Sequence, residues 1–194
     1  NVDRVEVLKG PAAGTYGATA PGGIINFITK KPQAKPAYTL DYIAGSDDYQ
    51  RVNGSATGPL ARDLFHRVDA TYYDFKRPTD WWYNRTLDIS TGLTWRLAPQ
   101  TSLSAEFAFT ERKANPYPVF TRWVDRAGRT QGLVYQIPDD QFPGYAERLS
   151  RFNQAGPYNR YERYNKSYYL TFQHRLSPAW SLQANLSYTD RRFR

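Results

Sequence analysis

The sequence predicts an all-β fold in which most of the chain forms an antiparallel meander. Apolar and polar residues alternate with period two over several segments, and the connections between these segments alternate between tight and long. The chain has 16 Tyr and 5 Trp, and several aromatic residues lie toward the ends of these segments. The absence of Cys excludes disulfides, thiol nucleophiles and zinc–thiolate sites. The absence of an apolar run of about 18 residues excludes a transmembrane helix.

The chain opens with two short apolar segments, Val2–Leu8 and Gly23–Thr29, which we predict to be strands. Between them, Lys9–Gly23 contains five glycines and two prolines, which indicate tight turns with special backbone angles. Pro32–Pro36 follows as a predicted linker.

Seven alternating segments follow the linker, and Leu87–Leu97 shows the pattern clearly. Apolar Leu87, Ile89, Leu93, Trp95 and Leu97 share one face, and polar Asp88, Ser90, Thr94 and Arg96 share the other. The predicted strands are Tyr38–Ala44, Val52–Ala56, Phe65–Phe75, Leu87–Leu97, Leu103–Phe109, Tyr168–Leu176 and Trp180–Tyr188.

The connections predict two chemically different ends for this sheet. Three are tight, at 58–63, 98–100 and 177–179, whereas those at 76–85 and 113–160 are long. The connection at 45–48 is short without belonging clearly to the tight class. Tight turns at one end and long loops at the other are typical of an outer-membrane β-barrel, whose tilted strands need about 9–11 residues to cross the bilayer.

A soluble antiparallel sheet with one face on a core explains the same alternation. The aromatic residues favour the membrane barrel. Trp95 and Trp180 lie beside tight turns, whereas Tyr72, Phe109, Tyr168 and Tyr188 lie toward the other strand ends. Two aromatic belts suit the two membrane interfaces better than they suit a core.

The opening stretch contains an ordered set of motifs: Arg4–Val7, Lys9–Pro11, Tyr16–Gly17, Pro21–Gly23, Ile25–Asn26 and Thr29–Pro32. This set resembles the C-terminal end of the plug domain of TonB-dependent outer-membrane receptors. The residues of these motifs are most similar to those of siderophore receptors of the ferrichrome type. Tyr161–Asp190 also resembles the early barrel strands of that subgroup, so the resemblance covers nearly the whole chain.

The resemblance implies a large barrel plugged by an N-terminal domain. Residues 1–34 are then the end of the plug, and residues 35–194 are an incomplete N-terminal portion of the transmembrane barrel with about seven strands. We expect the signal peptide, the TonB box, most of the plug and most of the barrel to lie outside this chain. Alone, the chain would expose sheet edges and an apolar face, and we expect it to be unstable by itself.

The sequence shows no enzymatic constellation, and we expect no enzyme, no cofactor and no metal site. His66 and His174 lie on different strands at apolar-parity positions, and Asp47–Asp48 and Asp139–Asp140 are expected to be solvated loop pairs. The glycines before Gly23 lack the Gly-Lys-Ser/Thr of a phosphate loop. The chemistry that remains is recognition.

The resemblance places Tyr16 in an apical plug loop that faces the outer vestibule, where its phenol is a candidate ligand contact. Packing of Tyr16 between plug and barrel wall is the alternative. The long connection carries further siderophore-contact candidates, Tyr117, Phe120, Trp123 and Tyr135, with membrane-boundary or loop packing as the alternative. Trp81 and Trp82 are interpreted as interface or loop-packing residues.

The segment Lys113–Arg160 has seven basic and four acidic residues, so its charge is 7 − 4 = +3. A positively charged segment at the outer opening of a barrel would attract an anionic iron chelate, and it would bind lipopolysaccharide phosphates equally well. The basic residues of the whole chain, with its net charge of +8, are scattered rather than clustered, which weakens a nucleic-acid role.

The predicted function is therefore uptake of ferric siderophores across the outer membrane of a Gram-negative bacterium, energised through TonB. The resemblance implies a monomeric barrel that contacts outer-membrane lipid and lipopolysaccharide, with no nucleic-acid partner. Cobalamin, haem or an oligosaccharide are alternative cargoes within the same family. A soluble basic β-domain that binds carbohydrate or single-stranded nucleic acid through aromatic platforms is an alternative from another class.

Overall fold

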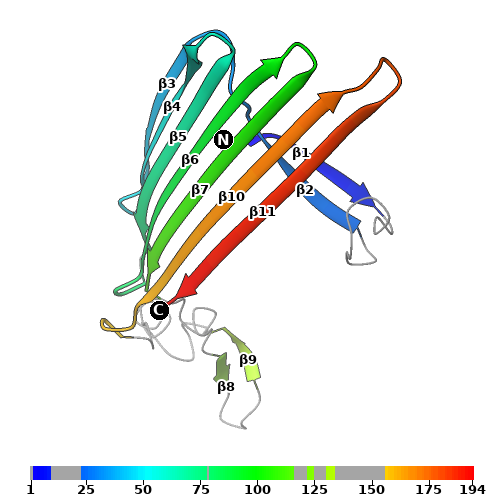
Figure 1. Ribbon diagram of the computed structural model, residues 1–194. Helices are drawn as coiled ribbons and strands as arrows, with labels where there is room; N and C mark the ends of the chain where they lie inside the picture. The colour runs from blue at the N-terminus through cyan, green and yellow to red at the C-terminus, as the bar shows by residue number, and fades with distance from the viewer. Residues whose placement is uncertain (1, 10–22, 78, 116–121, 125–129, 134–155) are drawn as a thin grey trace.

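The structure is a computed structural model that describes residues 2–9, 23–77, 79–115, 122–124, 130–133 and 156–194 (Figure 1). The described residues form eleven strands arranged in three antiparallel sheets. No helix long and apolar enough to cross a membrane occurs among them.

The first sheet is a hairpin of β1 (Val2–Lys9) and β2 (Gly23–Thr29), in which Val7 pairs with Ile25. This confirms the first two predicted strands. Gly23 begins β2 with φ +125°, and a Cβ atom there would lie 2.2 Å from the Leu8 carbonyl oxygen. The hairpin therefore requires glycine at this position.

The main sheet contains the seven strands that the alternation predicts, in the order β11-β10-β7-β6-β5-β4-β3. Its strands are β3 (Ala37–Ala44), β4 (Gln50–Ala61), β5 (Leu64–Lys76), β6 (Tyr83–Ala98), β7 (Thr101–Ala114), β10 (Tyr161–Arg175) and β11 (Ser181–Phe193). Strands that follow one another in this sheet along the chain also pair with one another. Strands β7 and β10 are consecutive in this sense, since β8 and β9 form a separate sheet within the connection between them. Among the described residues the sheet is open, with β3 and β11 at its edges, as expected for an incomplete barrel.

Most of these strands are longer than predicted, and β6 and β10 reach 16 and 15 residues. In β6, β10 and β11, and mostly in β7, the additional residues lie at the end with the long connections. Strand β4 instead extends mainly at its other end and takes up residues 58–61 of the predicted tight connection, which shortens that turn to 62–63. At the end with the long connections, Glu111 and Lys113 flank Arg112 on β7, so charged side chains occupy both faces and the period-two signal disappears. The backbone pairing continues regardless, because the ladder from Arg163↔Arg112 to Tyr161↔Ala114 is unbroken.

The two kinds of connection lie at opposite ends of the sheet, as predicted (Figure 1). The tight turns join β4 to β5, β6 to β7 and β10 to β11. The connection 45–49 joins β3 to β4 at the other end, together with 77–82 and the long segment from β7 to β10. The alternation between the two ends is therefore complete, including the connection that the sequence left ambiguous.

The apolar face of the sheet is the exposed one. Leu93, Trp95 and Trp180 are 44%, 50% and 73% exposed, whereas the polar face is mostly half-buried or buried. Among the described residues the buried hydrophobic side chains are Phe65, Trp82 and Ala114. A soluble sheet would bury its apolar face on a core. The inverted arrangement is that of a wall from a membrane barrel with a polar interior.

The third sheet was not predicted. It pairs β8 (Arg122–Val124) with β9 (Thr130–Leu133). Strands of three and four residues are too short to show a periodic pattern in sequence. They lie beyond the main sheet, at the end with the long connections (Figure 1).

Candidate functional site

The polar face of the main sheet is opposed by the hairpin strand β2. A cavity of about 950 Å³ separates them, lined by β2 residues and by polar-face residues of β4 to β7 and β10. The Thr29 hydroxyl, at the end of β2, donates a hydrogen bond to Glu106 Oε2 on β7 at 3.2 Å. The polar face of the sheet is therefore called the inner face.

The hairpin has its own charges and an apolar face. Arg4 Nε donates to Glu6 Oε1 at 2.8 Å, and Asn26 Nδ2 donates to the other oxygen of Glu6 at 3.4 Å. The hydrogen bond to Glu6 raises the pKa of Arg4. Both partners are exposed, so the pair contributes little to stability. One face of the hairpin presents exposed apolar side chains, Val5, Val7, Ile25 and Phe27.

The linker after β2 is fastened to the inner face. The Gln33 amide donates to Thr57 Oγ1 at 3.0 Å, and the Thr57 hydroxyl donates onward to the His66 carbonyl at 2.8 Å. Thr57 is only 2% exposed. Pro32 lies over Gly92, because a Cβ atom built on that glycine would be 3.5 Å from Pro32 Cγ. Small residues on the wall therefore allow the linker to approach it closely.

We expect Thr57→Val to loosen this attachment. The substitution keeps the shape but leaves the Gln33 amide without its acceptor and the His66 carbonyl without this donor, a cost of about 1–3 kcal/mol. Hydrogen exchange of the complete polypeptide that carries this chain, folded in detergent, is the measurement. The amide of Gln33 should exchange faster in the variant, while amides in β10 keep their protection. Unchanged exchange at Gln33 would contradict the role of Thr57.

A buried ion pair lies beneath the linker on the inner face. Arg67 Nε and Nη2 donate to the two carboxylate oxygens of Asp69 at 2.7 and 2.8 Å, and Nη2 also donates to Ser55 Oγ at 2.9 Å. The side chains of Arg67 and Asp69 are 9% and 13% exposed. This two-point geometry fixes both side chains and satisfies both charges.

Polar side chains continue across the inner face toward the end with the long connections. Thr110 Oγ1 donates to Asp88 Oδ1 at 2.6 Å, and Arg112 Nε donates to Asn84 Oδ1 at 2.9 Å. Asn84 and Thr86 are 5% and 4% exposed. The inner wall at this end is thus rich in hydrogen-bonding groups and carries cations, which suits recognition of a polar or anionic ligand.

The long connection from β7 to β10 is closed at its base by Asn115. Asn115 is 1% exposed. Its backbone N–H donates to the Tyr83 carbonyl at 3.2 Å, and its side-chain Nδ2 donates to the Gly156 carbonyl at 2.9 Å. Gly156 has φ +69°, a conformation that favours glycine. The contact joins residues 41 positions apart, and the predicted contact residues Tyr117, Phe120, Trp123 and Tyr135 fall between them in the sequence.

We expect Asn115→Ala to loosen the contact between the two ends of the long connection. The change removes the side-chain donor from the part-buried carbonyl of Gly156, a cost of about 1 kcal/mol. Limited proteolysis of the complete polypeptide is expected to cut within 116–155 several-fold faster in the variant, whereas cutting at 177–179 stays unchanged. Equal cutting rates at 116–155 would show that Asn115 does not hold the connection.

The described residues contain no group of three His, Cys, Asp or Glu side chains placed to hold a metal ion. His66 and His174 lie on β5 and β10, two strands that are not neighbours, and both have outward parity as predicted. His174 Nδ1 is 2.8 Å from Thr101 Oγ1, which gives this ring a structural partner. Asp48 forms an exposed ion pair with Lys76, which agrees with a solvated loop position.

Comparisons with known proteins decide the family. No family model matches the chain. The metal-pseudopaline receptor CntO of Pseudomonas aeruginosa is 30% identical over 184 residues, which cover 94% of this chain and 24% of the relative. The ferrichrome outer membrane transporter/phage receptor of Escherichia coli is 22% identical, covering 97% of this chain and 24% of the relative.

Solved structures agree on the fold. The ferripyoverdine receptor of the outer membrane of P. aeruginosa superposes with a TM-score of 0.80 at 24% identity, covering 97% of this chain and 24% of that structure. The siderophore receptor PiuA of Acinetobacter baumannii gives a TM-score of 0.80 at 18% identity, covering 99% of this chain and 26% of that structure. The chain belongs to the TonB-dependent outer-membrane receptors.

This receptor chain spans about a quarter of the length of the curated relatives that it matches. Its fold is all-β and forms part of a plugged antiparallel β-barrel, as the resemblance implied. The outward apolar face then lies against the outer membrane, and the inner face lines the lumen.

The predicted contact residues of the receptor chain are not brought together by the described part of the structure. Tyr16, Tyr117, Phe120 and Tyr135 lie outside the described residues, as does Asp139–Asp140. Trp123 lies in β8, and only its backbone is described. Their contact roles stay predictions. Trp82 is 6% exposed and packs 5.0 Å from the ring of Phe75, which confirms its loop-packing interpretation.

Sequence reasoning missed three structural features of this site: the pair Arg67–Asp69, the linker anchor Thr57 and the base residue Asn115. The spacing of Arg67 and Asp69, two apart at polar parity with opposite charges, was a usable signal. Asn115 directly before a proline, at the end of a strand, was a second signal. Nothing local marked Thr57, because its partners lie at Gln33 and His66.

Proposed function

We propose that the complete receptor carrying this chain takes up ferric siderophores across the outer membrane and is energised through TonB. The observation that carries the proposal is the inverted sheet, apolar outside and polar inside, with a plug-like hairpin against its inner face. Relatives named as ferrichrome and ferrioxamine receptors support the cargo class. Transport of this kind is binding and release, without a catalysed reaction.

The two parts of the chain have different roles in this proposal, one in the plug and one in the barrel wall. Residues 1–34 act as the end of the plug, and residues 35–194 supply seven strands of the barrel wall. Support comes from the hairpin, which forms its own sheet, and from the linker between Lys30 and Pro36, which joins it to the wall. TonB would act through a segment that lies outside this chain, and the complete receptor would work as a monomeric barrel in contact with lipid and lipopolysaccharide.

The siderophore would meet Tyr16 on the plug side and Tyr117, Phe120, Trp123 and Tyr135 on the long connection. A siderophore fills the coordination shell of ferric iron, so its receptor needs aromatic faces and hydrogen-bond donors rather than metal ligands. Asn115 fixes the base of the connection that carries four of these residues. The cations of the inner wall, including Arg112, would attract an anionic chelate.

A second cargo is favoured by one observation. One relative, at 30% identity over 94% of this chain, is named for a metal–pseudopaline complex. The cargo of this receptor would then be a metal–pseudopaline complex. The same aromatic and cationic chemistry serves either complex, so the two candidates differ only in the ligand to be tested.

The test is a titration of the complete receptor, folded in detergent, followed by tryptophan fluorescence. The ligands are ferrichrome, other ferric siderophores and metal–pseudopaline complexes. We expect one metal chelate to bind tightly, and Tyr117→Ala or Trp123→Ala to weaken its Kd about tenfold, or ~1.4 kcal/mol.

Trp180→Ala is the matched control, because Trp180 lies beside a tight turn at the opposite end of the sheet and is 73% exposed. Binding of cobalamin, haem or a glycan, but of no metal chelate, would overturn the cargo. Undiminished binding by Tyr117→Ala and Trp123→Ala would overturn the site.

A further inference from the structure

Three arginine residues gather on the inner face at the end with the long connections. Arg112 on β7 lies opposite Arg163 on β10, and Asn165 on β10 lies opposite Arg191 on β11. Residues directly opposite each other in antiparallel strands share a face of the sheet, and the hydrogen bond from Arg112 to Asn84 identifies that face as the inner one. The three arginines therefore lie on the lumen side of three neighbouring strands.

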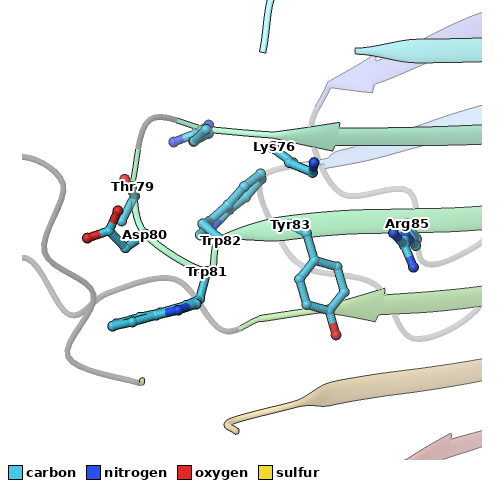
Figure 2. Close-up of a pocket in the computed structure, with 8 residues that line it drawn as sticks. Lys76, Thr79, Asp80, Trp81, Trp82, Tyr83 and Arg85 are labelled. Atoms are coloured by element: carbon cyan, nitrogen blue, oxygen red, sulfur yellow. The ribbon is translucent and has the colours of Figure 1, made fainter. Parts of the chain in front are cut away.

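Cations on the outward face of the same strand ends are paired with carboxylates. Four ion pairs occur there: Lys113–Glu111 at 2.7 Å, Arg192–Asp190 at 3.1 Å, Arg85–Asp74 at 2.8 Å and Lys76–Asp48 at 2.8 Å. Figure 2 shows Lys76 and Arg85 at the ends of β5 and β6. The outward charges of these strand ends are thus largely neutralised within the wall.

The inner face of the same strand ends has unbalanced charges. Within the described part of the chain, the three arginines form no ion pair. The carboxylate of Asp88, on the same face of β6, accepts a hydrogen bond from Thr110 at 2.6 Å. Arg112 and Arg163 stand directly opposite each other, and like charges in this position destabilise a sheet. An anion bound between them would remove this repulsion.

Polar atoms beside the arginines are buried without a hydrogen-bond partner among the described residues. They are Arg163 Nε, Asn165 Oδ1 and Thr86 Oγ1. Thr86 lies opposite Arg112 and is 4% exposed. The Arg163 Nε–H and the Thr86 hydroxyl can donate to a carboxylate, whereas Asn165 Oδ1 needs a donor such as a hydroxyl or an amine. Buried polar groups of this kind are satisfied when a ligand supplies the missing partners.

We propose that Arg112, Arg163 and Arg191 form a carboxylate-binding subsite for the metal chelate that the receptor takes up. A guanidinium group binds a carboxylate through two parallel hydrogen bonds, so three of them on neighbouring strands suit a chelate with at least two free carboxylates. The subsite selects such chelates over uncharged ones. The proposal rests on the transport function proposed above and names the chemical class of its cargo.

The first test uses the complete receptor, folded in detergent, and needs no variant. Phenylglyoxal modifies accessible guanidinium groups, and mass spectrometry of the digested receptor gives the rate at each arginine. Tricarballylate, a metal-free tricarboxylate, is expected to slow the modification of Arg163 and Arg191 about fivefold. Its triamide, which has the same carbon skeleton without charge, and inorganic phosphate should slow it by less than about twofold.

Arg192 is the internal control for this measurement. It follows Arg191 directly in the sequence but lies on the outward face, where it pairs with Asp190. Its rate of modification should change by less than about twofold when tricarballylate is added.

The second test measures binding of the metal chelate that the receptor binds most tightly in the fluorescence titration. Arg163→Gln with Arg191→Gln removes two inner charges, and Lys113→Gln with Arg192→Gln is the matched outward change. We expect the inner variant to raise the Kd about tenfold and the outward variant to change it by less than about twofold. The unfolding midpoint of the inner variant should not fall, because the change relieves repulsion between like charges.

A change in the ligand completes this second test. Conversion of the free carboxylates of the chelate to methyl esters should weaken its binding to the unmodified receptor about tenfold. The esterified chelate should bind the inner variant no more weakly than it binds the unmodified receptor, because the same interaction has already been removed.

The outcomes separate the subsite from the transport function. A tightly bound chelate without a free carboxylate, an unchanged Kd in the inner variant, or no slowing by tricarballylate would each overturn the subsite. Slowing by phosphate as strong as that by tricarballylate would overturn its selectivity for carboxylates. Slowing by tricarballylate together with no binding of any metal chelate would support the carboxylate site and contradict the transport function.

Discussion

Replacing Arg67 by Met is expected to destabilise the barrel wall by about 3–5 kcal/mol, because it leaves the carboxylate of Asp69 buried without its partner. The two side chains are 9% and 13% exposed and are joined at 2.7 and 2.8 Å, so water cannot readily replace the guanidinium. The measurement is guanidinium unfolding of the complete receptor in detergent, followed by far-ultraviolet circular dichroism. The midpoint is expected to fall.

A double change separates the charge effect from the packing effect. Arg67→Met with Asp69→Val removes both charges, and it is expected to recover most of the lost stability. Arg192→Met is the matched control, since the pair Arg192–Asp190 at 3.1 Å has side chains that are 75% and 29% exposed. That change is expected to cost less than about 1 kcal/mol. Equal costs at Arg67 and Arg192 would show that burial of the inner pair is not decisive.

Replacing Trp82 by Ala is expected to cost about 3–5 kcal/mol, the range for removing a large buried aromatic side chain. Trp82 is 6% exposed, packs 5.0 Å from Phe75 and lies under the guanidinium of Arg77 at 4.9 Å. Because these contacts hold the β5–β6 connection on the strand ends, its loss should also raise hydrogen exchange across 77–83. The unfolding midpoint and the exchange rates are the two measurements.

Trp81 provides the matched control for Trp82. It has the same side chain, one position earlier, but is 53% exposed. Trp81→Ala is expected to change stability by about 0.5 kcal/mol or less. A loss at Trp81 as large as that at Trp82 would contradict the assignment of Trp82 as the packing residue of the connection.

Arg67 and Trp82 stabilise two different parts of the wall, the inner face and the rim at the end with the long connections. Arg67 and Asp69 stabilise the inner face beneath the linker. There the Gln33 amide donates to Thr57, and Pro32 lies over Gly92. Trp82 stabilises the rim, where the long connections begin. A loss at Arg67 should therefore affect plug attachment, and a loss at Trp82 should affect the β5–β6 connection. Arg67 lies within β5 and Trp82 lies in the connection beyond its end, so their effects are expected to add.

The sequence by itself determined the strands and their faces. The period-two pattern of Leu87–Leu97 and its counterparts placed all seven strands, because alternation reflects the pleat of each strand without reference to its partners. The motifs from Arg4 to Pro32 determined the family, and the turn lengths determined which strand ends lie together. Strand ends such as Arg112 and Lys113 escaped prediction, because polar residues cover both faces there.

Only the tertiary structure decided how the elements meet. The contacts Thr29–Glu106, Gln33–Thr57 and Asn115–Gly156 join residues 77, 24 and 41 positions apart, and no local pattern encodes such pairings. It also showed which face is covered: the polar inner face lies against the hairpin, and the apolar face stays exposed. Alternation alone is the same for a soluble sheet and a barrel wall. What distinguishes them is the medium that each face contacts, and that depends on the assembled fold.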